Sequence, residues 1–424
     1  MRQWSIGFAF ATIVSTTTAT ATEGLIPNTA LEDTLSWINL SGSLRGGYWS
    51  GSRNLDDRHD LAVGSVWLKA APQLGDFGNI VFDGRHGNHA FPGSGQPERV
   101  REFYLESSYG NVDLRVGRQL LIWGRADRLN PTDNITPRDF TLLVPEDTDQ
   151  RFGTFMVKGA YHLDSLSFTA IWSPEFEPNV VPIAATPGIR LSEEVETHRR
   201  SWAVRLEQSG AAIDWSLSYL DGFNLNVDIG IAAIEPSGLV LSLRHLPTRV
   251  VGADLATTVG RYGLRAEAAY TRTEDTSGVD PFVMNSLFYL VAGGDRTFFE
   301  YLNVNLQAFV RHVSDFKNAN EITDPLVRMV AVQEAIITNQ LDRNTYGLAA
   351  RISNKWFYTT LDAELVAVYS WPRHDYVVRP KLSYAFTDRW IGTLGADVFR
   401  GDPQSFYGRL RSNSLVFGEI RFTF

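Results

Sequence analysis

The sequence has no cysteine, no excess of basic residues and no long apolar run. Without cysteine there can be no disulfide framework and no zinc site built on thiolates. No stretch reaches 18 consecutive apolar residues, which excludes a transmembrane helix. A formal net charge of −9 argues against nucleic acid as a partner, because such partners are bound by basic surfaces. If this chain crosses a membrane, it must cross as a closed β-barrel, in which every backbone polar group is paired.

The first residues have the composition of an export signal. Arg2 supplies positive charge, residues 6–14 form a short apolar core, and the small residues 19–21 fit a signal-peptidase site. We therefore expect residues 1–21 to be a signal peptide and residues 22–424 to form a single domain. No linker rich in proline, glycine or serine divides the remainder of the sequence. An exported chain of this size without cysteine suits the envelope of a Gram-negative bacterium.

Apolar and polar residues alternate along most of the chain, which predicts strands with one apolar and one polar face. In "LNVNLQAFVR", for example, Leu306 and Val310 share a face opposite Asn305 and Gln307. These stretches run about ten residues, enough to cross a bilayer at a tilt, and short turns alternate with long polar segments. The pattern predicts an all-β fold, a transmembrane antiparallel β-barrel of about 18 strands (16–18), with long extracellular loops and short periplasmic turns. The predicted strands are 39–49, 61–70, 78–86, 99–109, 111–122, 151–161, 164–174, 199–209, 211–221, 248–259, 262–273, 282–293, 301–313, 343–353, 356–370, 374–386, 389–400 and 412–424.

If the apolar face meets outer-membrane lipid, the opposite face lines a lumen. Many charged residues of both signs fall on that face, and a dry core could not hold them because each unpaired charge costs several kcal/mol. A water-filled lumen keeps such charges solvated; salt-bridge ladders that fill a closed barrel are the alternative. The predicted lumen-lining residues are Arg45, Asp83, Arg85, Glu102, Glu106, Arg115, Arg205, Arg265, Glu267, Arg311, Arg351, Arg379, Glu419 and Arg421.

One long segment, residues 123–150, mixes apolar residues with charges of both signs. Its apolar residues need something to bury against, so a disordered loop is not expected. Two placements remain open: a loop folded into the lumen, where it would narrow the pore, or a loop packed over the barrel rim. In the first placement the residues expected at the pore constriction are Arg125, Arg128, Asp133, Arg138 and Asp139.

Two parts of the sequence resemble known families. The hairpin "YGNVDLRVGRQLLIWG" followed by "LNPTD", within residues 109–153, resembles a poorly characterised family of bacterial outer-membrane barrels with a Gly-Arg-Gln, Trp-Gly and Asn-Pro-x-Asp series. More distantly, Gly117-Arg118-Gln119 is similar to the alginate-export and porin barrels. The final "LVFGEIRFTF" resembles the C-terminal signal of such barrels. This implies that Phe422 and Phe424 act as an assembly signal for the barrel-assembly machinery.

The function that this sequence predicts is an outer-membrane channel, porin-like, for hydrophilic and charged solutes or a polysaccharide. No enzymatic activity, cofactor or metal is expected; His86 and His89 share a loop, but two histidines lack a third ligand. One alternative is an outer-membrane enzyme of phospholipase type, in which His312 and Ser314 of "RHVSD" would serve as base and nucleophile. The other is a non-conducting barrel that acts as a scaffold for an envelope complex.

Overall fold

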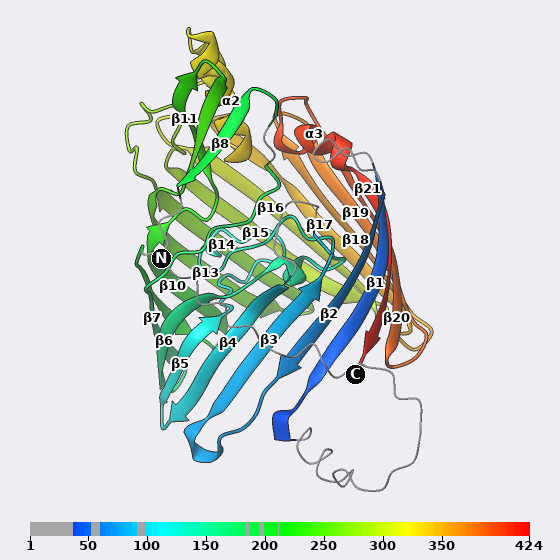
Figure 1. The fold of residues 1–424 in the computed structure, drawn as a ribbon. Helices are drawn as coiled ribbons and strands as arrows, with labels where there is room; N and C mark the ends of the chain where they lie inside the picture. Colours follow the sequence, from blue (N-terminus) through cyan, green and yellow to red (C-terminus); the bar gives the residue numbers. More distant parts are fainter. Residues whose placement is uncertain (1–36, 52–59, 91–97, 184–185, 195–198, 211) are drawn as a thin grey trace, which may run out of the picture.

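The computed structural model describes residues 37–51, 60–90, 98–183, 186–194, 199–210 and 212–424, so the predicted signal peptide lies outside the described residues. Within them, 18 strands form one sheet that closes on itself (Figure 1). Closure is made by β1 (Ser41–Gly51), which pairs antiparallel with β21 (Leu415–Thr423). The predicted all-β antiparallel barrel and its strand number are therefore confirmed.

The barrel is a meander in which each strand pairs with its neighbours along the chain, apart from three short strands that lie outside it. None of the helices in the described ranges is both long and apolar enough to cross a membrane. The remaining barrel strands are β2 (Asp60–Ala70), β3 (Asn79–Gly87), β4 (Glu98–Tyr109), β5 (Val112–Gln119), β6 (Thr154–Leu163), β7 (Leu166–Ser173), β9 (Ser201–Gln208), β10 (Ile213–Phe223), β13 (Pro247–Val259), β14 (Tyr262–Arg272), β15 (Leu287–Phe298), β16 (Leu302–Val313), β17 (Asn344–Trp356), β18 (Leu361–Trp371), β19 (Asp375–Ala385) and β20 (Trp390–Arg400). Short helical turns are η1 (Gly75–Phe77), η2 (Asp147–Gln150), η3 (Ala319–Glu321), α3 (Phe406–Arg409) and η4 (Leu410–Asn413).

The two faces of the wall follow the predicted alternation. On β16 the outward Leu306 is 52% exposed, whereas the inward Gln307 is 2% exposed. Many leucine, valine and aromatic side chains of the wall are exposed, as expected of a wall that meets lipid.

The strand boundaries differ most from the prediction at two places, the β17–β18 hairpin and strand β15. The turn expected between 353 and 356 is wrong, because β17 continues to Trp356 and the chain reverses at residues 357–359, which all have positive φ. The polar residues that suggested a turn belong to the strand, and Lys355 faces Asp362 across the hairpin at 3.8 Å. Strand β15 also begins five residues later than predicted. The segment before it is instead held by a cap at the long-loop end of the barrel, where the N–H of Met284 donates to Asp228.

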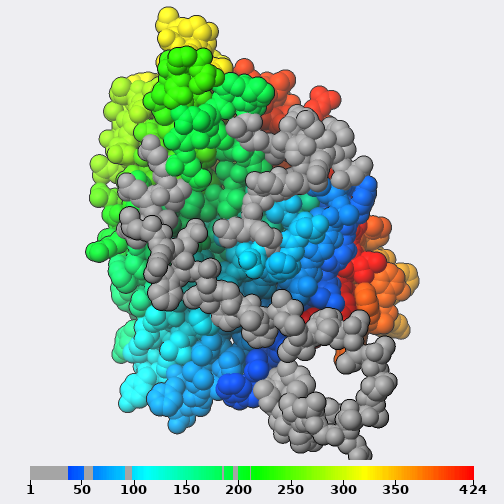
Figure 2. Space-filling view, viewed as in Figure 1, coloured from blue at the N-terminus to red at the C-terminus, as the bar shows by residue number. Residues whose placement is uncertain are grey.

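The cap is formed by β8 (Ile189–Glu194), β11 (Asp228–Glu235), β12 (Gly238–Arg244) and α2 (Pro325–Ile337). The three strands make a separate sheet in which β12 runs antiparallel to β11 and parallel to β8. The N-cap of α2 is Asp324, whose side chain accepts from two backbone N–H groups. In Figure 2 the cap projects beyond the barrel as adjoining green and yellow surfaces. The sequence pattern predicted these segments only as long polar loops; it missed their strands and helix, which share an apolar core of their own.

Candidate functional site

Residues 120–153, which connect β5 to β6, lie inside the barrel; we call them the lumen loop. Its apolar residues pack on inward-facing residues of several walls. Trp123 joins a cluster that includes Met156 and Val250, whereas Leu143 packs with Trp49 and Phe417. Figure 1 shows the loop in teal across the interior. Of the two placements that the sequence left open, the structure has the loop within the lumen and not over the rim.

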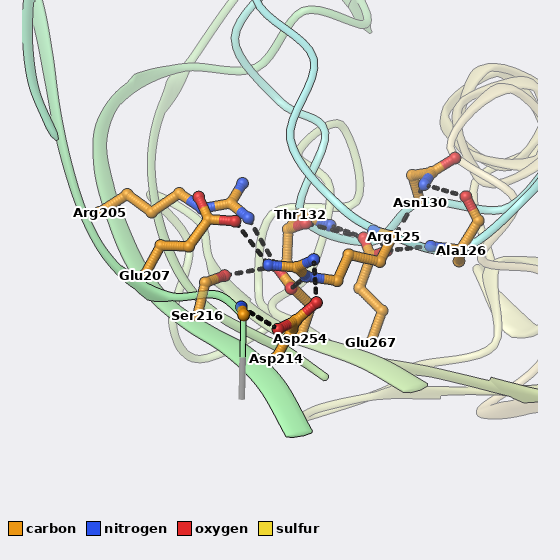
Figure 3. A network of polar contacts seen from close by, with 11 residues as sticks. Arg125, Ala126, Asn130, Thr132, Arg205, Glu207, Asp214, Ser216, Asp254 and Glu267 are labelled. Atoms are coloured by element: carbon orange, nitrogen blue, oxygen red, sulfur yellow. Dashed lines mark hydrogen bonds and ion pairs between the residues drawn. The ribbon is translucent and has the colours of Figure 1, made fainter. Parts of the chain in front are cut away.

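The start of the lumen loop wraps around the carboxylate of Glu267 on β14 (Figure 3). Glu267 Oε2 accepts from the backbone N–H groups of Arg125 and Ala126, both at 3.1 Å, and Oε1 accepts from the N–H of Thr132 at 2.7 Å. The hydroxyl of Thr132 and the amide of Asn130 also donate to this carboxylate. Glu267 is 1% exposed, so the barrel wall supplies the buried acceptor that these loop donors require.

Gly124 permits this arrangement. Its φ is +98°, in the left-handed region that favours glycine, and a Cβ there would stand 2.5 Å from a carboxylate oxygen of Glu267. The Trp-Gly and Asn-Pro elements of the motif are therefore explained by contact with Glu267: glycine allows the close approach, and Asn130 and Thr132 add donors.

Arg125, at the start of the lumen loop, contacts an acidic part of the barrel wall. Arg125 donates from Nε to Asp254 of β13 at 2.6 Å and from Nη2 to Glu207 of β9 at 2.5 Å, with Asp214 of β10 at 3.8 Å (Figure 3). Arg205 also contacts Asp254, at 3.3 Å. Three carboxylates from neighbouring strands thus share two guanidinium groups.

The end of the lumen loop carries carboxylates, and these contact a basic part of the barrel wall. Glu146 accepts from Lys381 of β19 at 2.8 Å, Asp147 contacts Arg379 of the same strand, and Asp149 accepts from Arg45 of β1 at 2.5 Å. Burial works against the ionised form of Asp147, but the guanidinium groups outweigh it and hold its pKa below the ordinary value. The loop is therefore charge-complementary to the wall at both of its ends.

The five residues expected at the constriction all lie in this loop, but they do not all face solvent. The side chains of Arg128 and Arg138 are 24% and 28% exposed, and Arg128 contacts Asp147. Asp133 and Asp139 were expected to face the water path, and this is wrong. Asp139 is fully buried against Arg85 of β3, at 3.3 Å, and the side chain of Asp133 is buried against Arg138 and Arg151 of the loop, so both carboxylates are paired away from water.

The residues predicted to line the lumen belong to the inward face of the wall, yet several are covered. Asp83, Arg85, Arg205, Glu267 and Glu419 are buried, mostly beneath the lumen loop or beside its partners. The others remain partly exposed within the barrel: Arg45, Glu102, Glu106, Arg115, Arg265, Arg311, Arg351, Arg379 and Arg421.

Two residues that anchor this network were missed from the sequence. Asp254 could have been found, because it alternates with the outward Val251 and Leu255 on β13. Arg101 could not, since a register shift between β3 and β4 places it out of the simple alternation. Arg101 donates to the buried Asp83 at 2.8 Å and to the backbone oxygen of Arg151 at 3.0 Å, so it holds the loop's end.

The other candidate chemistries find little geometric support. His312 faces outward, and its Nδ1 lies 2.7 Å from Asn344 Oδ1; no contact joins its ring to the Ser314 hydroxyl in the described part of the chain. His86 is exposed, whereas His89 is buried beside Trp67. Burial, together with Arg85 and Arg45, lowers the pKa of His89 to about 4, which keeps it neutral. Among the described residues, no group of three or more potential ligands could hold a metal ion.

Comparison with known proteins finds likeness in structure alone. No protein-family model matches this chain, and no curated protein matches it, so the motif-based resemblance stays a prediction. OccAB1 of Acinetobacter baumannii superposes with a TM-score of 0.55 at 11% identity, over 91% of this chain and 96% of that one. A BenF-like porin from Pseudomonas fluorescens Pf-5 gives 0.54 at 7% identity, over 91% and 97%. Wzi of Escherichia coli, described as a carbohydrate-binding β-barrel involved in group 1 capsule assembly, gives 0.50 at 10% identity, over 94% and 86%. At these identities the likeness shows a shared fold, that of outer-membrane β-barrels of the porin type.

Proposed function

We propose that this protein is a porin-like channel of the Gram-negative outer membrane, through which small hydrophilic solutes pass the lumen loop. The observation that carries the proposal is the exposure of charged groups inside a closed barrel. The side chain of Glu146 is 46% exposed, and those of Arg351 and Glu207 are 35% and 31% exposed. A solidly packed interior would bury these groups, so their exposure supports a solvent-filled path beside the loop.

The two walls on either side of that path carry opposite charges. The acidic wall comprises Glu207, Asp214 and Asp254, and the basic wall comprises Arg45, Arg379 and Lys381. A field between such walls orients dipolar and charged solutes, and it acts most strongly where the path is narrow and screening is weak. Because the lumen loop contacts both walls, it divides the proposed solute path. This favours small solutes over a polysaccharide chain.

The apolar outer surface fits lipid as the surrounding medium, and the barrel architecture fits the outer membrane. In this proposal the residues of the lumen loop have a positioning and selecting role and no chemical step. Lys381, Arg379 and Arg125 fix the loop, while Arg128 and Glu146 contact the solute path.

Swelling of liposomes that contain the purified protein tests the proposal. We expect monosaccharides and amino acids to enter, and entry to slow steeply as solute size increases toward trisaccharides. A reconstituted, correctly folded barrel that admits no solute of any size would overturn the channel and favour the scaffold alternative. A boiled sample provides the matched control, since a barrel that loses its fold on heating should also lose all permeation.

A further inference from the structure

The cap contains two buried carboxyl groups in contact. Asp228 of β11 is 1% exposed and Glu334 of α2 is 3% exposed, and their side chains are within hydrogen-bonding contact. Asp228 Oδ1 accepts from the backbone N–H of Met284 at 2.8 Å, and Glu334 Oε2 accepts from that of Ile229 at 2.5 Å. Glu334 Oε1 is buried, and no donor among the described residues hydrogen-bonds to it.

The charges around this pair balance only if one proton is retained. Among the described residues, the cation that acts on both carboxyl groups is Arg244 of β12, the register partner of Asp228; Asn224 and the Met284 amide contribute dipoles. One guanidinium with two carboxylates would leave a net negative charge in an apolar core built from Val227, Ile229 and Val330. With one carboxylate and one carboxylic acid the group is neutral, and the acid donates to its neighbour.

The cap is joined by hydrogen bonds to the lumen loop. Asn179 donates its N–H to Leu225 O at 2.9 Å, three residues before Asp228. The next residue, Val180, donates to Arg138 O and accepts from Phe140 N, both at 2.9 Å. Val181 and Ile183 then pack against the cap core. Residues 179–183 therefore touch the lumen loop at one end and the cap at the other.

We propose that Asp228 and Glu334 share one proton that locks α2 onto β11, and that its loss releases the cap and, through residues 179–180, loosens the lumen loop. Release follows because two adjacent buried carboxylates repel each other in a medium that screens weakly. The effect on conduction rests on the proposed channel function, whereas the docking of the cap does not.

The direction of the pH dependence follows from linkage. Burial raises the pKa of Asp228 to about 6, and burial together with the charge of Asp228 raises the pKa of Glu334 well above its ordinary value. A carboxyl pKa that is higher in the docked cap than in the open one stabilises docking fully below the ordinary value. That stabilisation is lost as the pH rises through the raised pKa. Over this window the opening equilibrium should increase about tenfold per pH unit for one proton released.

Hydrogen exchange of the intact barrel in detergent, corrected for the intrinsic pH dependence, tests the lock. Between pH 5 and 8 we expect the amides of α2 and of Ile229 to lose protection in the wild type. In Glu334→Gln, whose amide keeps a donor toward Asp228 at every pH, they should stay protected. Glu274→Gln, at an exposed glutamate of the same end, is the matched control and should behave as wild type. Equal protection of wild type and Glu334→Gln across this range would overturn the shared proton.

The coupling and the channel have separate readouts. The amides of Val180 and Phe140 should lose protection with those of α2, and channel noise in planar bilayers should rise over the same pH range. Opening of α2 with no change at Val180 and Phe140 would overturn the coupling. Absence of conductance at every pH, with the exchange as expected, would overturn the proposed function and leave the lock supported.

Discussion

Arg125 Nε of the lumen loop lies 2.6 Å from Asp254 Oδ1 on the barrel wall, 129 positions along the chain. This contact joins a loop that follows the fifth strand to a strand more than a hundred residues later. It belongs to a set of contacts that hold the loop at both ends, with cations toward the acidic wall and anions toward the basic wall.

Glu267 should be the residue that holds the start of the lumen loop. Replacing it by alanine leaves the buried N–H groups of Arg125, Ala126 and Thr132 without an acceptor, at about 1–3 kcal/mol for each donor that stays dry. We expect Glu267→Ala to increase single-channel conductance and current noise, and Glu267→Gln to do so less. The matched control is Glu106→Gln, an inward carboxylate that pairs with Arg115 at 2.9 Å. If Glu267→Ala gives the currents of the control, Glu267 does not position the loop.

Gly124→Ala should reproduce the effect of losing Glu267. The side chain meets both an unfavourable φ and the Glu267 carboxylate, and a non-glycine residue in such a conformation costs about 1–3 kcal/mol. Because both substitutions disrupt one contact, the double variant should differ little from either single variant in conductance. Additive effects in this double-mutant cycle would show that the two residues act independently.

Arg128 should influence ion selectivity. Its side chain is partly exposed and contacts Asp147, so Arg128→Glu changes the local charge by two units and places two carboxylates together. We expect the reversal potential in a KCl gradient to shift toward cation selectivity. Arg343→Glu, at an exposed arginine of the long-loop end, provides a control of equal charge change. A similar shift in both variants would mean that the loop has no special position in the path.

Phe424 should matter for assembly. Its backbone pairs with Gly42 of β1 through two hydrogen bonds, of 2.9 and 3.1 Å, and its ring neighbours Phe422. Phe424→Ala preserves the backbone pairing, so a fall in the amount of folded barrel in the outer membrane would point to recognition of the ring. Phe424→Tyr should retain wild-type levels. Normal assembly of the alanine variant would show that the aromatic ring is dispensable.

Much of the wall could be read from the sequence, because the alternation that a lipid-facing strand requires is strictly local. Leu306 and Gln307 reveal their faces by their chemistry alone, and so does Arg379. The alternation also gave the strand number. It failed at Arg101, where the register shifts, and at Lys355, whose polarity suggested a turn.

The arrangement of the interior could not be read in the same way. The lumen loop was recognised by its length and composition, but the pairing of Arg125 with Asp254 depends on the closure of a distant part of the barrel. The burial of Asp139 likewise depends on Arg85, which no local pattern connects to it. The cap was missed because its strands are short, and its core is assembled from four separate segments.

We expect the lumen loop to set the narrowest point of a conducting barrel, and single-channel conductance in planar bilayers is the most direct test of this role. Replacing about 20 residues of the loop, 126–145, by a short Gly/Ser linker should leave the 18-stranded wall intact and open an otherwise wide lumen. Heat-modifiable mobility in electrophoresis confirms that the variant barrel is folded. We expect a conductance several times that of the wild type; an unchanged conductance in the folded variant would show that the loop does not set the narrowest point.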